Sequence, residues 1–298
     1  MQNSNYKIAF VYEYGDESWS TPQSLINEFT RRGHSVRKYH LTKYENFSQE
    51  LAENSFDILI TLDWKGVDLP QDVHDIIPST CFKIRECADT PQNYEKHLPY
   101  IKNYNLLLTP DFWSSEKYTA SGTRCIWFHH FADTNIHRVY PLVDSMPPVR
   151  STRGQGGSNI MDYLSTLMPS KFINRNGLIG PEYGQFLSNG KIVIQHSRWG
   201  EITRRVFEGM ACNSLVLTDR LMEHTKISEL FEEGKEIVYY DDIPSLISKI
   251  NYYLCPEGEG ERLFIANNGF NKVIKHHTQV NRVNEIINNY ITWKGSSQ

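Results

Sequence analysis

The feature that most constrains the fold is the regular alternation of short β-rich runs with helical stretches. In the first 130 residues, runs such as KIAFVYEY, FDILITLD, TCFKIREC and NLLLTPD are separated by segments with helical spacing. Strands that alternate with helices form right-handed βαβ units and a parallel sheet, with the functional loops at the carboxyl ends of the strands. The sequence therefore predicts an α/β protein with its site at that edge.

The alternation lapses once, over residues 133–158, in a stretch rich in Pro, Gly, Ser and Arg, and then resumes. A chain of 298 residues is long enough for two domains that each bury a core. We therefore predict an N-terminal domain over residues 1–140, a C-terminal domain over 141–275 and a helical tail over 276–298.

The composition argues against several classes of protein. No apolar run is long enough to span a membrane, and the N-terminus does not have the pattern of a secretion signal. The five cysteines form neither a CxxC pair nor a Cys/His metal spacing. A formal net charge of -4 without a polybasic block argues against a chain that wraps nucleic acid. We therefore expect a cytoplasmic protein with reduced thiols and no zinc site.

The segment SRWGEITRRVFEGMACNSLVLTD places several charged side chains beside a short apolar stripe. A helix over Glu201–Cys212 would put Arg204 and Glu208 four residues apart on one side, where they could form a simple exposed ion pair. The alternative is a ligand site, because this helix follows the strand KIVIQHS. Its N-terminus would then open at the carboxyl edge of a parallel sheet, where free N–H groups favour an anion.

A second candidate ligand loop is RSTRGQGG, in which Arg150 and Arg153 lie close to Gly154, Gly156 and Gly157. Glycines let the backbone approach a ligand closely, and arginines donate to phosphate oxygens. The loop matches neither the P-loop nor the GxGxxG fingerprint, which argues against a P-loop NTPase and an NAD enzyme. A flexible interdomain linker is the alternative interpretation.

Three consecutive stretches of the second half carry a family resemblance: RRVFEGMACNSLVLTDR, LFEEGKEIVYYDDIPSLISKINYYL and GERLFIANNGFNKVIKHHTQVNRVNEII. Together they resemble the C-terminal half of the CgeB-like, group 1 type glycosyltransferases, over about Lys191 to Ile287. In the first half, FHHFADTNIHRVYP and ADTPQNYEKHLPYIKNYNLLLTPD are similar to the segment that joins the family's domains and to the loop after its fourth strand.

The resemblance implies a GT-B fold, in which two Rossmann-like domains face each other across a cleft and the last helix crosses back to the first domain. The C-terminal domain would hold a nucleotide-sugar donor and the N-terminal domain an acceptor. The resemblance assigns the donor ribose to Glu208 and the diphosphate to Thr203 and Arg204. Where the family usually has Gly, this chain has Asn213, which also tolerates a left-handed backbone.

Glycosyl transfer needs a base that deprotonates the acceptor and positive charge beside the leaving diphosphate. For the base, Asp89 is the first candidate, although an aspartate before Thr-Pro can also be a turn or cap residue. Glu13, Asp16 and Asp63 follow other strands and are alternatives. His129 and His130 either contact the donor or pack at the domain junction. The predicted donor-binding residues are Arg153, Arg198, Thr203, Arg204, Glu208, His129, His130, Gly156 and Gly157.

The sequence therefore predicts a glycosyltransferase that moves a sugar from a nucleotide diphosphate to a hydroxyl of a glycan, lipid-linked or small-molecule acceptor. We expect it to need no metal and no cofactor, because Asp241 and Asp242 are better explained as a strand end and a helix cap than as a DxD motif. The spacing of ITRRVFEGMACNSLVLTD also resembles that of the DNA glucosyltransferases of T-even phages, with Lys65, Lys83 and Arg85 as a candidate basic patch. A GT-B-type sugar-nucleotide epimerase and a non-catalytic nucleotide-sugar-binding protein are further alternatives.

Overall fold

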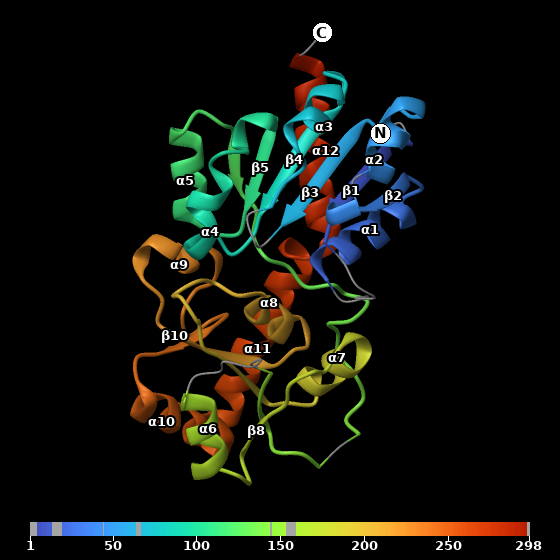
Figure 1. Ribbon diagram of the computed structural model, residues 1–298. Coiled ribbons are helices and arrows are strands. Elements are labelled where there is room, and N and C mark those ends of the chain that lie inside the picture. Colours follow the sequence, from blue (N-terminus) through green and yellow to red (C-terminus); the bar gives the residue numbers. More distant parts are fainter. Residues whose placement is uncertain are drawn as a thin grey trace. The chain divides into compact units, whose positions relative to one another are not determined.

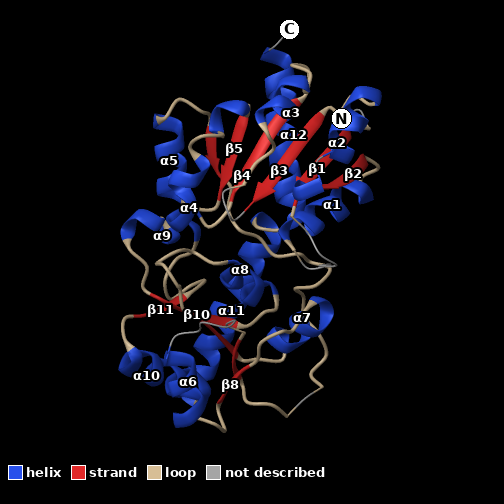
Figure 2. Ribbon diagram, in the orientation of Figure 1, coloured by secondary structure: helices blue, strands red, loops and turns tan. Residues whose placement is uncertain are grey.

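The computed structural model describes residues 5–13, 20–43, 45–63, 67–143, 145–152 and 159–296. The chain divides into two compact units (Figure 1). Unit 1 comprises Met1–His129 together with Val280–Gln298, and unit 2 comprises His130–Gln279. Each unit is a parallel sheet with helices packed against it (Figure 2), which confirms the predicted α/β class. Among the described helices, none has the length and apolar character needed to cross a membrane.

Unit 1 contains a six-stranded parallel sheet in the order β2-β1-β3-β4-β5-β6. Its strands are β1 (Lys7–Tyr12), β2 (Ser35–His40), β3 (Ile58–Asp63), β4 (Phe82–Cys87), β5 (Leu106–Thr109) and β6 (Cys125–Trp127). The connecting helices are α1 (Thr21–Arg31), α2 (Glu45–Glu53), α3 (Gln71–Ile76), α4 (Thr90–His97) and α5 (Phe112–Ala120), with short 3₁₀ turns at Leu41–Lys43 and Ile101–Asn103. Alternate residues of β1 face opposite sides, as a pleated strand requires: Phe10 packs near Phe29 of α1, whereas Ala9 belongs to a cluster with Phe47 of α2 and Val73 of α3.

Unit 2 contains a five-stranded parallel sheet in the order β11-β10-β9-β7-β8. Its strands are β7 (Val149–Ser151), β8 (Phe172–Asn174), β9 (Ile192–Gln195), β10 (Leu215–Asp219) and β11 (Val238–Tyr240). The helices are α6 (Asn159–Leu167), α7 (Gly180–Ser188), α8 (Arg204–Ala211), α9 (Ile227–Leu230), α10 (Ile243–Leu254) and α11 (Pro256–His276), with a 3₁₀ turn at Glu223–Thr225. Buried residues from all five strands and from α6, α10 and α11 form one core cluster, including Val149, Leu164, Ile194, Leu217 and Ile250.

Helix α1 begins directly after Ser20, its N-cap, whose Oγ accepts a hydrogen bond from the Gln23 N–H at 3.4 Å. The chain leaves the helix at Gly33, which has a left-handed φ of +87°. Asn213 has a φ of 58°, so the asparagine adopts the left-handed conformation expected of it.

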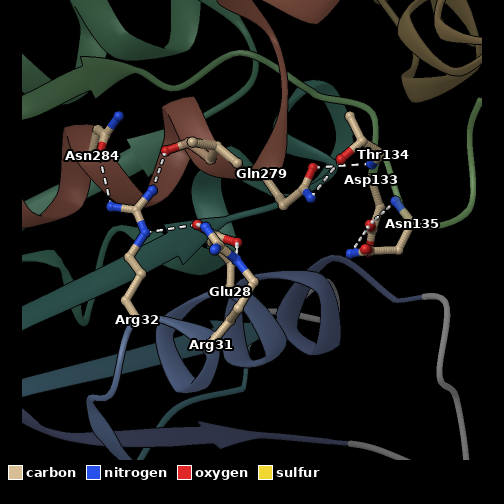
Figure 3. Close-up of polar contacts among 9 residues, drawn as sticks. Glu28, Arg31, Arg32, Asp133, Thr134, Asn135, Gln279 and Asn284 are labelled. Atoms are coloured by element: carbon tan, nitrogen blue, oxygen red, sulfur yellow. Dashed lines mark hydrogen bonds and ion pairs between the residues drawn. The ribbon is translucent and has the colours of Figure 1, made fainter.

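The last helix, α12 (Gln279–Ser296), packs on unit 1 through both polar and aromatic contacts. Arg32 donates to the Val280 carbonyl at 3.0 Å and to Asn284 Oδ1 at 2.6 Å, while its Nε pairs with the buried Glu28 carboxylate at 2.7 Å (Figure 3). Further along α12, Trp293 packs on Phe82 of β4, with ring centroids 5.0 Å apart. Contacts with α1 and with the sheet therefore hold the C-terminal helix in unit 1.

Candidate functional site

The candidate donor site is built around α8 in unit 2. The helix begins at Arg204, three residues later than the sequence predicts, with Thr203 as its N-cap. The preceding residues turn instead, because the Glu201 carboxylate accepts the backbone N–H groups of Arg198 at 3.3 Å and Trp199 at 2.7 Å. Thr203 Oγ1 is a buried atom without a hydrogen-bond partner among the described residues. It therefore leaves a polar group at the N-terminus of α8 that a ligand oxygen could satisfy.

Glu208 lies one turn into α8, and only 7% of the residue is exposed. Tyr183 on α7 donates its hydroxyl to Oε2 at 2.6 Å, and Arg204 Nε lies 3.4 Å from Oε1. Burial by itself raises the pKa of this carboxyl, but His137, Arg204 and the Tyr183 hydroxyl outweigh that effect, and the net pKa is lowered. The predicted Arg204–Glu208 pair therefore forms, but it is a largely buried arrangement around an ionised carboxylate and not an exposed surface pair.

His137 faces the other side of the Glu208 carboxylate, with Nε2 3.7 Å from Oε1. Its Nδ1 accepts the backbone N–H of Asp133 at 3.1 Å, which places the ring proton on Nε2, toward the carboxylate. Burial lowers the pKa of His137 despite the nearby Glu208, so the ring is neutral near pH 7. The histidine thus presents an N–H dipole to Glu208, while Arg204 provides the positive charge.

The backbone of α7 fixes the positions of both Tyr183 and His137. A Cβ on Gly184 would lie 2.0 Å from the Ile136 carbonyl oxygen, so only glycine allows the segment before His137 to pack this closely on α7. Ser188 on the same helix accepts the Tyr140 N–H at 2.8 Å and extends this contact. The rings of His137 and Tyr183 meet edge to face, with centroids 5.6 Å apart.

A hydrogen-bond chain connects Glu208 to the end of β7. Arg205 Nε donates to Thr152 Oγ1 at 2.8 Å, and the Thr152 hydroxyl donates to Tyr183 Oη at 3.5 Å. Arg205 also donates to the Gln195 Oε1 atom at the end of β9, at 2.7 Å. Arg205 therefore has a structural role that joins α8 to the carboxyl ends of two strands.

The remaining predicted donor residues have different positions. Arg198 is exposed, with its guanidinium 4.9 Å from the Trp199 ring centroid. Arg153, Gly156 and Gly157 lie outside the described residues. The prediction that Arg150 of the same loop contacts a ligand is wrong, because Arg150 is fully buried on β7 and donates to the Phe186 carbonyl at 2.6 Å.

The two predicted histidines belong to different units. His129 ends unit 1, where burial lowers its pKa to about 3 and its ring meets Trp127 edge to face at 4.2 Å. His130 begins unit 2, with its ring centroid 6.4 Å from that of Phe207. Both rings therefore have aromatic neighbours within their own units.

Among the predicted catalytic carboxylates, Asp89 is exposed at the N-cap position of α4, just after β4. Its φ of 48° is left-handed, and its side chain makes no capping hydrogen bond. Glu13 is partly exposed and follows β1. All of Asp16 and the side chain of Asp63 lie outside the described residues. Asp89 and Glu13 therefore both follow the carboxyl ends of unit 1 strands.

Two other predictions concern charged residues that are neither donor-binding nor catalytic candidates. Asp242 caps α10 by accepting the Ser245 N–H at 2.7 Å, and Asp241 pairs with Arg220 at 2.5 Å, so the structural interpretation of this aspartate pair is confirmed. Arg85, proposed as part of a basic patch, is instead fully buried, with NH1 2.9 Å from Asp68 Oδ1. Arg85 therefore cannot contact a nucleic-acid phosphate.

Sequence reasoning missed Tyr183, His137 and Thr152. Thr152 is part of the RSTRGQGG stretch and His137 is part of the FHHFADTNIHRVYP stretch, but neither was identified as a neighbour of Glu208. Tyr183 and Glu208 are 25 residues apart on different helices, and no local pattern pairs them. Only the packing of α7 beside α8 brings them together.

Comparison with known proteins agrees with this architecture. Residues 163–288 match the family model described as glycosyl transferase-like. No curated protein sequence matches the chain. Among solved structures, Anabaena HepE in complex with UDP and glucose superposes with a TM-score of 0.68 at 13% identity, covering 97% of this chain and 100% of that one. Sucrose-phosphate synthase from Thermosynechococcus elongatus gives 0.69 at 10% identity, covering 98% and 100%.

A third similar structure is the lipopolysaccharide outer core galactosyltransferase WaaB in its apo form, with a TM-score of 0.61 at 13% identity, covering 97% of this chain and 99% of that one. At these identities the superpositions show the fold alone, whereas the family match rests on the sequence of residues 163–288. The chain thus has the GT-B fold, and its residues 163–288 match the glycosyl transferase-like family model.

Proposed function

We propose that this protein transfers a sugar from a nucleoside-diphosphate sugar to an acceptor hydroxyl, with the donor bound in unit 2. The observation that supports this most directly is the ionised, buried Glu208 carboxylate one turn from the N-terminus of α8. A carboxylate in that state accepts strong hydrogen bonds, as two ribose hydroxyls would donate. The family match over this part of the chain supports the same assignment.

The donor diphosphate would lie at the N-terminus of α8. Thr203 Oγ1 is available there as a hydrogen-bonding group, and Arg204 brings a guanidinium to the same turn. A helix N-terminus and a cation both stabilise the charge that develops on a leaving diphosphate. We propose that these groups provide that stabilisation without a metal ion.

The acceptor would bind in unit 1, where Asp89 is the proposed general base. Its exposed carboxylate, just after β4, would take a proton from an acceptor hydroxyl as that oxygen attacks the sugar C1. The C1–O bond to the diphosphate then breaks, and the leaving nucleotide carries the released charge. We propose a glycan, lipid-linked or small-molecule hydroxyl as the acceptor.

The test is thermal stabilisation by a panel of UDP-, GDP-, ADP-, CMP- and dTDP-sugars, with and without magnesium, because a ligand that binds the native state raises Tm. UDP-glucose is the first ligand to try, since HepE has been crystallised with it. Glu208→Ala should raise the donor Kd by roughly 5- to 150-fold, which corresponds to the loss of about 1–3 kcal/mol of hydrogen bonding.

Glu259→Ala is the matched control, because Glu259 also pairs with an arginine, Arg262 at 2.8 Å, but lies on α11. Equal donor affinity in the wild type and in Glu208→Ala would remove Glu208 from the site. Donor binding without sugar release to any acceptor or to water would instead favour a nucleotide-sugar-binding protein.

A further inference from the structure

We propose that Tyr183 and His137 are positioning residues that hold the Glu208 carboxylate ionised and in one orientation for the donor. This inference rests on the proposed function, because it assigns Glu208 to donor binding. Neither residue needs to touch the donor. Their role follows from the contacts that each makes with the two carboxylate oxygens.

Each carboxylate oxygen of Glu208 has its own protein partners. Oε2 accepts the Tyr183 hydroxyl at 2.6 Å, and Oε1 faces His137 Nε2 at 3.7 Å and Arg204 Nε at 3.4 Å. A carboxylate has about four acceptor positions, so these contacts leave room for further hydrogen bonds. Because the partners come from α7, from the segment before Tyr140 and from α8 itself, they define one orientation of the carboxyl plane.

The hydroxyl of Tyr183 is itself oriented by the chain behind it. Arg205 donates to Thr152, Thr152 donates to Tyr183, and Tyr183 donates to Glu208, so each hydroxyl accepts one hydrogen bond and donates the next. Such a chain is polarised in one direction and strengthens its last bond. Arg205 and Glu208 are both on α8, so the chain closes a loop through β7 and α7.

The electrostatic environment keeps Glu208 charged. Besides Tyr183, His137, Arg204 and Arg205, the described titratable groups near this cluster are Cys212, the C-cap of α8, and Asp133, which contacts His137. Burial raises the pKa of the Cys212 thiol, so it stays neutral. Removal of the Tyr183 hydroxyl would take away a hydrogen bond that is stronger to the carboxylate than to the protonated acid, and the pKa of Glu208 would rise.

The experiment is a pH profile of donor affinity for Tyr183→Phe, using the nucleotide sugar that stabilises the wild type. The variant should bind about 2- to 12-fold more weakly at pH 7, as expected for one lost hydrogen bond. The acid limb of its profile should also move to higher pH. A purely structural role would change Tm but would not move this limb.

Tyr140→Phe is the matched control, because it removes a hydroxyl that donates at 3.0 Å to the Ile136 carbonyl in the same region without touching Glu208. If Tyr183→Phe does not fold, His137→Asn provides the same measurement: it removes the Nε2 donor and keeps an acceptor near the Asp133 N–H. An acid limb that matches that of Tyr140→Phe would overturn the inference. This outcome differs from failure of the proposed function, in which Glu208→Ala itself would leave donor affinity unchanged.

Discussion

Gly184 is where the structure makes its sharpest stability prediction. A methyl group there would have to lie 2.0 Å from the Ile136 carbonyl oxygen, 2.9 Å from its carbonyl carbon and 3.1 Å from Tyr140 Cε2. Ordinary contact begins at 3.4 Å, and the obstructing atoms are backbone rather than the end of a flexible side chain. In Gly184→Ala, the segment that includes Ile136 must therefore retreat from α7.

The magnitude follows from two opposing terms. Overpacking against a fixed neighbour costs about 1–3 kcal/mol, whereas Gly→Ala within a helix gains about 1 kcal/mol. Gly260→Ala on α11 isolates the second term, since its added methyl group meets nothing within 4 Å. The difference in unfolding free energy between the two variants is thus the overpacking term alone. At about 2–4 °C per kcal/mol, Gly184→Ala should melt roughly 2–12 °C below Gly260→Ala.

The assay is thermal unfolding of both variants and the wild type, followed by donor binding. Because His137 follows Ile136 directly, the same displacement should move it away from Glu208 and weaken donor binding in Gly184→Ala alone. Equal rises in Tm for both alanine variants would contradict this prediction, because they would mean that the space at Gly184 is not restricted.

Two further predictions concern unit 1. Asp89→Asn should leave donor affinity nearly unchanged and lower kcat by about 10²- to 10⁴-fold, the range for losing a general base. Asparagine also tolerates the left-handed φ of 48° at this position, so the substitution should not disturb the backbone. Full transfer activity in this variant would place the base elsewhere. Burial, reinforced by Arg85, lowers the pKa of His97 from 6.5 to about 3, so between these values the unfolded chain binds a proton that the folded chain does not. The contribution of His97 to the free energy of unfolding should therefore be fully present above pH 6.5. Below pH 6.5 this contribution should fall with decreasing pH, by up to about 1.4 kcal/mol per pH unit. Chemical denaturation from pH 7 to 4 should show a shallower decline in the free energy of unfolding for His97→Gln than for the wild type. Tyr118→Phe is the control, because it removes the 3.0 Å hydroxyl contact to His97 but keeps the imidazole, and its decline should match that of the wild type. Identical slopes for both variants would contradict the assignment to His97.

The local features of the fold were readable from the sequence because short-range physics sets them. The four β-rich runs quoted from the first 130 residues are strands β1, β3, β4 and β5 of the parallel sheet in unit 1. Boundaries were less accurate where a side chain intervened. The Glu201 carboxylate, which accepts two backbone N–H groups, delays the start of α8 to Arg204.

The sequence was enough to predict the parallel α/β architecture, the order of its elements and the position of Glu208 one turn into a helix that follows a strand. These depend on apolar periodicity and on neighbours a few residues apart. Long-range packing, in contrast, buries Arg150 and Arg85 and brings Tyr183 and His137 to Glu208. Such contacts depend on how α7, α8 and the segment before Tyr140 pack together, and a glycine that permits a close backbone approach looks in sequence like any other glycine.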